Sequence, residues 1–274
     1  MKVVLFCGGL GMRLREYSEN IPKPMVMIGY RPILWKIMKY YAHYGHKDFI
    51  LCLGYKGDMI KDYFLNYNEY VSNDFVFSEG GKDLQLLNSD IHDWKITFVD
   101  TGMTSNIGQR LKAVQPHLEG EEVFLANYSD GLTDLPLDQM IEHFYSKNKI
   151  ASFLAYQSTQ SFHVVKLQND DSVESIRPIA NSGLWINCGC FILRKEIFDY
   201  MEDGDELVER PFQRLISENQ LIAYRYNGFW VAMDTFKDKQ LLDDMHAKGN
   251  TPWDVWRKPN TKLVSSKENA PFKL

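Results

Sequence analysis

The chain has 274 residues, of which 45% are apolar and 24% are charged, a composition typical of a soluble globular enzyme. Its formal net charge of -5 argues against nucleic acid as the main partner, because phosphate backbones select basic surfaces. No apolar run approaches the roughly 18–20 residues that span a bilayer, and the apolar start is too short for a signal peptide, so we expect a cytoplasmic protein without membrane contact.

The first half of the chain alternates strand and helix patterns. Residues 2–7 form a continuous apolar run, which is typical of a parallel strand buried on both faces. Further along, the patterns predict strands at 48–53, 95–99, 122–126 and 150–155, and helices at 32–44, 58–67, 107–118 and 137–146. This alternation favours an α/β fold with a doubly wound, mostly parallel sheet, in which ligands bind beyond the carboxyl ends of the strands.

The second half is richer in strand patterns. Strands are predicted at 162–167, 173–176, 184–193 and 221–226, with less regular helices between them. We interpret this half as a β-rich C-terminal extension that covers the active site and does not form a separable domain. Residues 1–249 are therefore expected to form one domain, followed by a packed arm and tail at 250–274.

A glycine-rich loop directly follows the first predicted strand. Gly8, Gly9 and Gly11 allow the backbone to approach a triphosphate closely and to present N–H donors to it. The dinucleotide-binding fingerprint would require a third glycine at Leu14, and the Gly-Lys-Ser/Thr end of a Walker A loop is absent. We therefore expect the loop to bind phosphate without forming either of these two motifs.

Two cations accompany this loop. Arg13 lies within it, and Lys23 lies between Pro22 and Pro24, which restrict the backbone around the lysine. A lysine held in this way is suited to neutralising charge on a phosphate.

Two aspartates suit a metal site. Asp130 lies before Gly131 at the end of a predicted strand, and Asp234 lies far along the chain before Thr235. Mg²⁺ usually binds one or two carboxylates together with substrate phosphates, so two aspartates brought together by the fold would hold it.

The composite of Gly-Gly-x-Gly-x-Arg-Leu at 8–14 and Pro-Lys-Pro-Met at 22–25 resembles the signature of the sugar-1-phosphate nucleotidyltransferase family. The resemblance covers roughly residues 1–256 and is strongest to the glucose-1-phosphate cytidylyltransferase branch, through runs such as 28–35, 54–57, 99–102 and 228–235. It implies a Rossmann-like nucleotidyltransferase fold, a homo-oligomer, Mg²⁺ as cofactor, and CTP and a sugar 1-phosphate (glucose 1-phosphate as the best guess) as substrates. The nucleotide-binding part would span about 1–135 and the sugar-binding part about 136–249.

The resemblance also implies roles for individual residues. The catalytic set is Arg13, Lys23, Asp130 and Asp234, and the two aspartates are the metal ligands. The nucleotide-binding set is Leu5, Gly8, Gly9, Gly11, Met12, Arg13, Lys23 and Gly108, in which Met12 replaces the usual threonine. The substrate-binding set is Arg177, Asn187, Gly189 and His163.

Departures from the family pattern concentrate on the acceptor side. The family's Glu-Lys-Pro motif is absent, and Arg177 is the nearest cation to its lysine. His163 stands where relatives have glycine, and Cys188 replaces a glycine between Asn187 and Gly189.

Several functions therefore remain open. The first is cytidylyl transfer to glucose 1-phosphate or another hexose 1-phosphate, and the second is the same chemistry on another phosphorylated acceptor, such as an alditol phosphate. The third is a non-catalytic nucleotide-binding paralogue that regulates a partner, and a dehydrogenase is a distant fourth. Retention of Arg13, Lys23, Asp130 and Asp234 argues against the third.

Overall fold

The structure, a computed structural model, describes residues 1–9, 21–157 and 162–257. Gly11, Met12 and Arg13, three of the predicted site residues, lie outside the described residues.

In the described part of the chain, seven strands form one central sheet in the order β14-β10-β13-β8-β1-β4-β7. Neighbouring strands run parallel except at β13, which is antiparallel to both β8 and β10. The predicted α/β fold with a mostly parallel sheet is confirmed. The strands are β1 (Val3–Phe6), β4 (Asp48–Leu53), β7 (Lys95–Asp100), β8 (Val123–Asn127), β10 (Ala151–Gln157), β13 (Trp185–Arg194) and β14 (Leu221–Tyr226).

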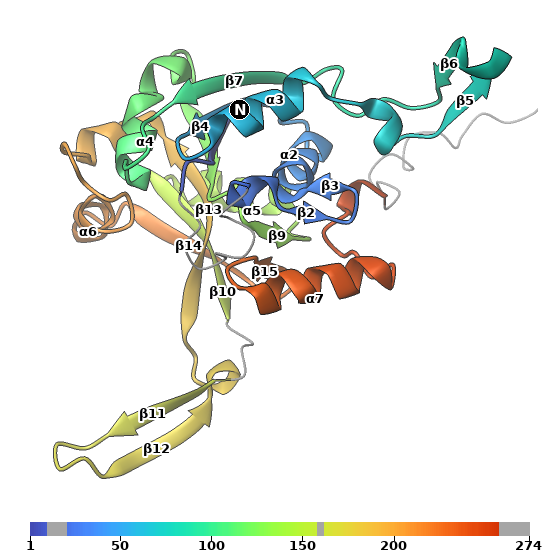
Figure 1. Cartoon of the computed structure of the whole chain (residues 1–274). Helices are drawn as coiled ribbons and strands as arrows, with labels where there is room; N and C mark the ends of the chain where they lie inside the picture. The colour runs from blue at the N-terminus through green and yellow to red at the C-terminus, as the bar shows by residue number, and fades with distance from the viewer. Residues whose placement is uncertain (10–20, 158–161, 258–274) are drawn as a thin grey trace, which may run out of the picture.

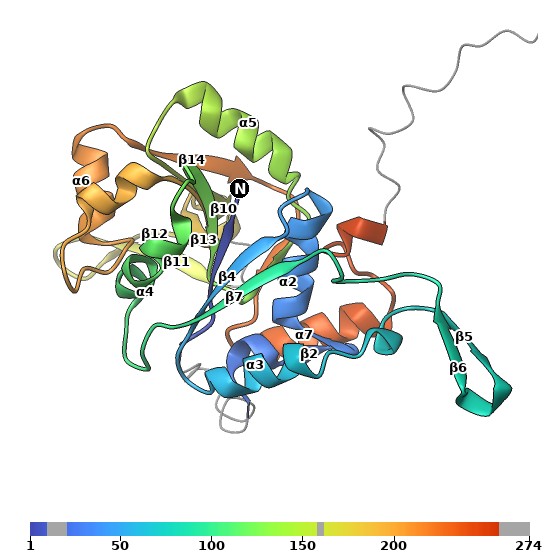
Figure 2. The ribbon, with the colours of Figure 1, turned by 90° about the horizontal axis from the view of Figure 1, so that it is seen from above.

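Helices cover both faces of this sheet (Figure 2). Alternate side chains of β1 point to opposite faces, so Val3 and Leu5 join one apolar cluster while Val4 and Phe6 join the other. The first cluster includes side chains of α2 (Ile33–His43), α3 (Gly57–Leu65), α5 (Leu137–Lys147) and α7 (Phe236–Ala247), and the second includes those of α4 (Ile107–Ala113) and α6 (Arg210–Ser217). None of the helices in the described ranges combines the length and the apolar composition needed to cross a bilayer.

The structure corrects two sequence-based predictions. The helix predicted at 107–118 ends at Ala113, and a 3-10 turn follows at Gln115–Leu118, because Pro116 has no N–H for the helix ladder. The helices of the second half were expected to be less regular, but α6 and α7 are regular α-helices. One of them, α7, begins with a capping box in which Thr235 and Asp238 each accept a backbone N–H of the other.

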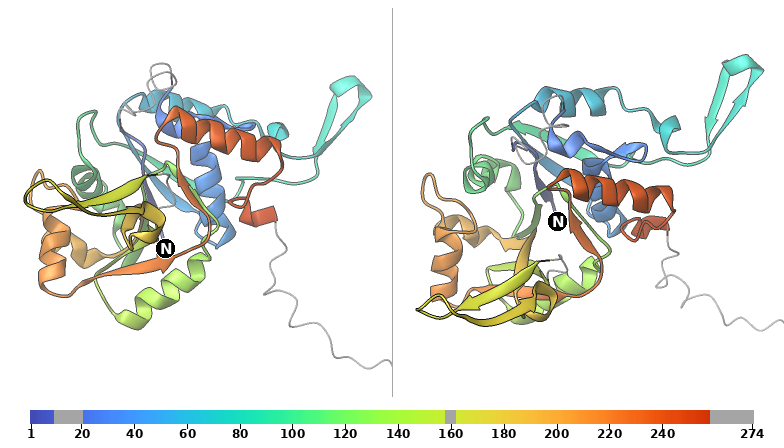
Figure 3. Two further views of the ribbon diagram at one scale, coloured as in Figure 1. Left: turned by 90° about the horizontal axis from the view of Figure 1, so that it is seen from below. Right: turned by 60° about the horizontal axis from the view of Figure 1, so that its bottom comes forward.

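Within the described ranges, four short strand pairs lie outside the central sheet. β9 (Gly131–Thr133) pairs with β15 (Trp230–Ala232), and β2 (Met27–Ile28) pairs with β3 (Arg31–Pro32). The other two are hairpins that project from the body in different directions (Figures 1 and 3). They are formed by β5 (Phe75–Ser78) with β6 (Asp83–Leu86), and by β11 (His163–Leu167) with β12 (Val173–Pro178).

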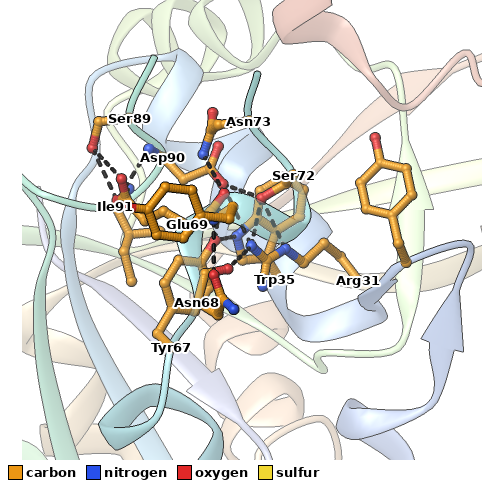
Figure 4. Close-up of polar contacts among 12 residues, drawn as sticks. Arg31, Trp35, Tyr67, Asn68, Glu69, Ser72, Asn73, Ser89, Asp90 and Ile91 are labelled. Atoms are coloured by element: carbon orange, nitrogen blue, oxygen red, sulfur yellow. Dashed lines mark hydrogen bonds and ion pairs between the residues drawn. The ribbon is translucent and has the colours of Figure 1, made fainter. Parts of the chain in front are cut away.

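A buried arginine anchors the base of the β5–β6 hairpin (Figure 4). Arg31 is 2% exposed and donates hydrogen bonds to the Ser72 hydroxyl and to the carbonyl of Asn68, both of which precede β5. It also lies 3.7 Å from the carboxylate of Asp90, which follows β6, and over the ring of Tyr67 at 4.3 Å. Both ends of the hairpin are thus held by one side chain, which directs the hairpin away from the body.

Candidate active site

The centre of the candidate site is an ion-paired triad. The Nζ atom of Lys23 lies 2.7 Å from Oδ2 of Asp130 and 2.7 Å from Oδ1 of Asp234. These residues are separated by 107 and 211 positions along the chain, so only the fold brings them together.

Backbone pairing next to the aspartates sets their position. β9 begins one residue after Asp130, and β15 ends two residues before Asp234, and these strands pair with Gly131 opposite Ala232. The pairing extends through a hydrogen bond of 2.8 Å from the Met233 N–H to the Asp130 carbonyl. The two carboxylates are therefore carried on adjacent, hydrogen-bonded backbone.

Ser129 holds the turn that carries Asp130. It is fully buried with φ of +65°, a conformation that is uncommon for residues other than glycine and that concentrates at functional sites. Its N–H donates to Oδ1 of Asn127 at 2.9 Å, which compensates part of the strain. Ser129 thus takes a backbone conformation that favours glycine, at the turn that carries Asp130.

Electrostatics favour the charged form of Lys23. Burial alone would lower the pKa of Lys23, but the carboxylates of Asp130 and Asp234 together outweigh burial and raise it. The lysine therefore stays protonated at neutral pH and shares its charge between the two aspartates.

A cleft of about 690 Å³ opens beside the triad at the carboxyl ends of β1 and β8, the edge of the sheet where the sequence predicts ligand binding. Its walls combine the triad with backbone of the glycine loop, the segment before α4 and the loop before α6. Its lining residues are Phe6, Cys7, Gly9, Lys23, Pro24, Met103, Thr104, Ser105, Asn106, Ile107, Arg110, Tyr128, Ser129, Asp130, Glu206, Val208 and Asp234.

Arg110 is a buried cation in this cleft that the sequence analysis did not identify. One of its guanidinium nitrogens donates to the Gly8 carbonyl at 3.0 Å, and the other donates to the Thr101 hydroxyl at 2.7 Å. A Cβ at Gly8 would lie 2.0 Å from this guanidinium, so the first glycine of the loop is required by the close approach of Arg110. The sequence signal was a lone arginine on a predicted helix, which is usually a solvated residue.

The other predicted nucleotide-binding residues take different positions. Gly9 lines the cleft, whereas Leu5 is fully buried within β1. Gly108 lies in the first turn of α4, where a Cβ would approach the Asp205 carbonyl to 2.1 Å. Gly108 therefore allows the loop before α6 to pack closely on α4, and it is not among the residues that line the cleft.

The predicted acceptor residues fall into two groups. Asn187 and Gly189 lie beside Tyr128, whose N–H donates to the Gly189 carbonyl at 3.0 Å and whose side chain hydrogen-bonds Asn187. Arg177 and His163 are exposed on the β11–β12 hairpin and are not among the residues that line the cleft.

The two aspartates fit a divalent cation. Lys23 shows that carboxylate oxygens of Asp130 and Asp234 reach one cationic centre at the same time. No cluster of three or more His, Cys, Asp or Glu side chains suited to a metal occurs within the described residues. A donor set of two carboxylates, completed by phosphates and water, is the one that Mg²⁺ commonly uses.

Comparison with protein families identifies the type of enzyme. A family described as nucleotidyl transferase matches residues 2–238. This chain belongs to that family. The family assignment made from the glycine-loop and Pro-Lys-Pro-Met motifs is therefore confirmed, and the protein is a nucleotidyltransferase.

Two curated relatives place this nucleotidyltransferase near the cytidylyltransferases. It is 36% identical over 258 residues to a probable glucose-1-phosphate cytidylyltransferase of Bacillus subtilis (strain 168), covering 93% of this chain and 100% of that protein. It is 37% identical over 257 residues to the glucose-1-phosphate cytidylyltransferase of Salmonella typhi, again covering 93% and 100%.

Solved structures of distant sequence share the fold. A UDP-glucose pyrophosphorylase complexed with UDP-glucose superimposes with a TM-score of 0.66 at 15% identity, covering 90% of this nucleotidyltransferase and 98% of that chain. HddC from Yersinia pseudotuberculosis superimposes with a TM-score of 0.64 at 23% identity, covering 89% and 99%.

Proposed function

We propose that this nucleotidyltransferase transfers CMP from CTP to glucose 1-phosphate and releases pyrophosphate, forming CDP-glucose. The observation that carries this proposal is the convergence of Lys23, Asp130 and Asp234 at one edge of a cleft large enough for a nucleotide. The choice of CTP and glucose 1-phosphate is supported by two relatives at 36% and 37% identity whose names specify that activity.

The reaction needs no protein nucleophile. An oxygen of the sugar phosphate attacks the α-phosphorus of CTP in line, a new P–O bond forms, and the bond between the α-phosphorus and the bridging oxygen breaks. Pyrophosphate leaves with that electron pair. Because the attacking oxygen is already anionic, catalysis consists of positioning the two substrates and stabilising their charge.

Different residues would position the substrates and stabilise their charge. Lys23 would neutralise charge near the α-phosphate, and the Gly9 backbone would approach the phosphates. Arg13, which lies outside the described residues, would hold the leaving pyrophosphate. Asp130 and Asp234 would hold Mg²⁺, which supplies charge neutralisation for the triphosphate when it is bound. When the metal and the nucleotide are bound, Lys23 would pair with phosphate oxygens instead of the two carboxylates.

The acceptor would bind beyond the triad. Asn187 and Gly189, which pack beside Tyr128, would contact the sugar, and Arg177 would pair with the acceptor's phosphate in place of the family's lysine. His163 would add bulk on the same side. The second candidate is an acceptor other than glucose 1-phosphate, such as another sugar phosphate or an alditol phosphate, because Arg177 and His163 depart from the family pattern.

The active form is proposed to be a homo-oligomer. Directly opposed residues on the β5–β6 hairpin place Phe75, Phe77, Leu84 and Leu86 on one apolar face, and Phe77 is 63% exposed. A two-stranded hairpin is only marginally stable in water by itself. A second copy of this chain that covers the apolar face would stabilise the hairpin.

A pyrophosphate-release screen tests the proposed reaction. The purified protein is incubated with Mg²⁺, each of five triphosphates (ATP, CTP, GTP, UTP and dTTP) and each of a panel of sugar and alditol phosphates. The expected result is highest turnover with CTP and glucose 1-phosphate. Turnover with another acceptor would establish the second candidate, a tenfold preference for dTTP would overturn the choice of CTP, and no turnover with any pair would indicate the non-catalytic paralogue.

A further inference from the structure

The lining of the cleft leaves a separate region for the base. The proposed phosphate-binding groups come from the loops after β1, β8 and β15 and from the turn at Lys23–Met25. Apart from Phe6 at the end of β1, the remaining lining consists of residues 103–107 at the start of α4, of Arg110 on α4, and of Glu206 and Val208 before α6. The guanidinium of Arg110 already bonds three backbone carbonyls and the Thr101 hydroxyl, so the base and ribose would lie against the other two segments.

Glu206 is a carboxylate fixed within this region. Its Oε2 accepts a hydrogen bond from the Ile107 N–H at 3.1 Å, and its Oε1 accepts one from the Leu207 N–H at 3.1 Å. The side chain is half-buried, and in the described part of the chain no lysine or arginine forms an ion pair with it. Burial raises the pKa of Glu206 and the two N–H bonds oppose that shift, so the protein alone incompletely stabilises the ionised form.

An ionised carboxylate is a specific neighbour for a base. It accepts hydrogen bonds and cannot donate them, and each oxygen has a lone pair left after one backbone bond. Cytosine presents an amine donor at position 4, whereas uracil and thymine present a carbonyl oxygen there. A carboxylate therefore attracts the edge of cytosine and repels the edges of uracil and thymine.

We infer that Glu206 determines base specificity by accepting a hydrogen bond from the exocyclic amine of the nucleotide base, which selects CTP over UTP and dTTP. This inference rests on the proposed function and names the residue behind its choice of nucleotide. Glu206 lies outside every motif that pointed to the family, and the two hydrogen bonds that fix it are donated by backbone N–H groups of its own loop and of α4.

The test compares equilibrium binding of CTP and UTP, each with Mg²⁺, to the wild type and to Glu206→Gln. The glutamine amide donates a hydrogen bond to the uracil carbonyl, so the ratio of the UTP to the CTP dissociation constant should fall at least about tenfold. Glu209→Gln, the same change on an exposed residue of the same loop, removes a charge that raises the pKa of Glu206, so it favours the ionised carboxylate and should not lower this ratio. An unchanged ratio in Glu206→Gln would overturn the inference.

A ligand-side experiment keeps the inference testable if the variant folds poorly, since one backbone N–H loses its acceptor in Glu206→Gln. The triphosphate of a pyrimidinone riboside without any substituent at position 4 lacks the amine without introducing a carbonyl. It should bind the wild type at least about tenfold more weakly than CTP. Equal binding would contradict a role of the amine.

Failure of this inference and failure of the proposed function give different results. If the wild type forms CDP-glucose and Glu206→Gln keeps the wild-type binding ratio, the inference fails and the function stands. If the wild type binds CTP in preference to UTP, loses that preference in Glu206→Gln and turns over no sugar phosphate, the proposed function fails and the inference stands.

Discussion

At the scale of single residues, Asp130 and Asp234 concentrate two negative charges at Lys23. We expect Asp130→Asn and Asp234→Asn each to lower turnover at least about a hundredfold, about 2.7 kcal/mol, because either change removes a carboxylate that would hold the metal. The measurement is the rate of pyrophosphate release at saturating Mg²⁺. Asp244→Asn, an exposed aspartate on α7, is the matched control and should leave turnover unchanged. Full Mg²⁺-dependent turnover in either site variant would refute the assignment.

Arg177 permits a second test at the same scale. We expect Arg177→Ala to raise the acceptor KM at least about tenfold and to leave the KM for the nucleotide nearly unchanged, because an acceptor phosphate near a triphosphate requires a cation. Steady-state kinetics with each substrate varied in turn measure both values. Lys166→Ala on the same exposed hairpin is the control. If the acceptor KM stays constant in Arg177→Ala, another cation binds the acceptor.

At the scale of elements, α4 is tied to the glycine loop through Arg110, which bonds three backbone carbonyls and one hydroxyl at 2.7–3.1 Å. Arg110→Lys should lower the free energy of unfolding by roughly 2 kcal/mol, because an ammonium cannot reproduce the planar fork and leaves buried acceptors unpaired. Urea unfolding measures the change. Lys112→Arg, at a partly exposed position of α4 where the ion pair with Asp203 can be kept, should have an effect close to zero. Equal stability of the two variants would mean that Arg110 does not stabilise the loop.

At the scale of the whole molecule, the apolar face of the β5–β6 hairpin predicts assembly with a second copy. We expect light scattering to show an oligomer for the wild type and a smaller species for Phe77→Asp, because the charge prevents burial of that face. Leu65→Asp changes an equally apolar side chain, 82% exposed on α3, and should leave the mass unchanged. A monomeric wild type would contradict the proposal.

Histidine burial predicts that acid destabilises the whole fold. Burial, and next the nearby N-terminal ammonium, lower the pKa of His46 from its ordinary 6.5 to about 4. Between these values the unfolded chain binds a proton that the native protein does not, so stability is fully present above pH 6.5 and declines as the pH falls toward 4. Chemical denaturation at several pH values should show this slope, and His46→Gln should reduce it. If stability depends on pH equally in the wild type and in His46→Gln, other titratable groups cause the dependence.

The sequence identified the fold class and the three residues that converge at the site. The continuous apolar run of β1 and the alternation of strands and helices reflect burial on both faces of a parallel sheet, which is a local pattern. Lys23 between two prolines and the aspartates beside turns were also recognisable from local sequence. In the structure a carboxylate oxygen of each aspartate lies 2.7 Å from the Lys23 ammonium. Their catalytic roles remain predictions for the variants above.

Tertiary structure decided the features that depend on partners distant in the chain. Arg110 and Glu206 have no local motif, because each acquires its role only when α4 packs against the glycine loop and against the loop before α6. The β5–β6 hairpin was not predicted, since its direction depends on the contact of Arg31 with residues on both sides of it. Sequence alone therefore determined the type of sheet, the family and the charged groups of the chemistry. The structure alone decided which buried groups line the cleft, because burial and pairing arise only when separate segments meet.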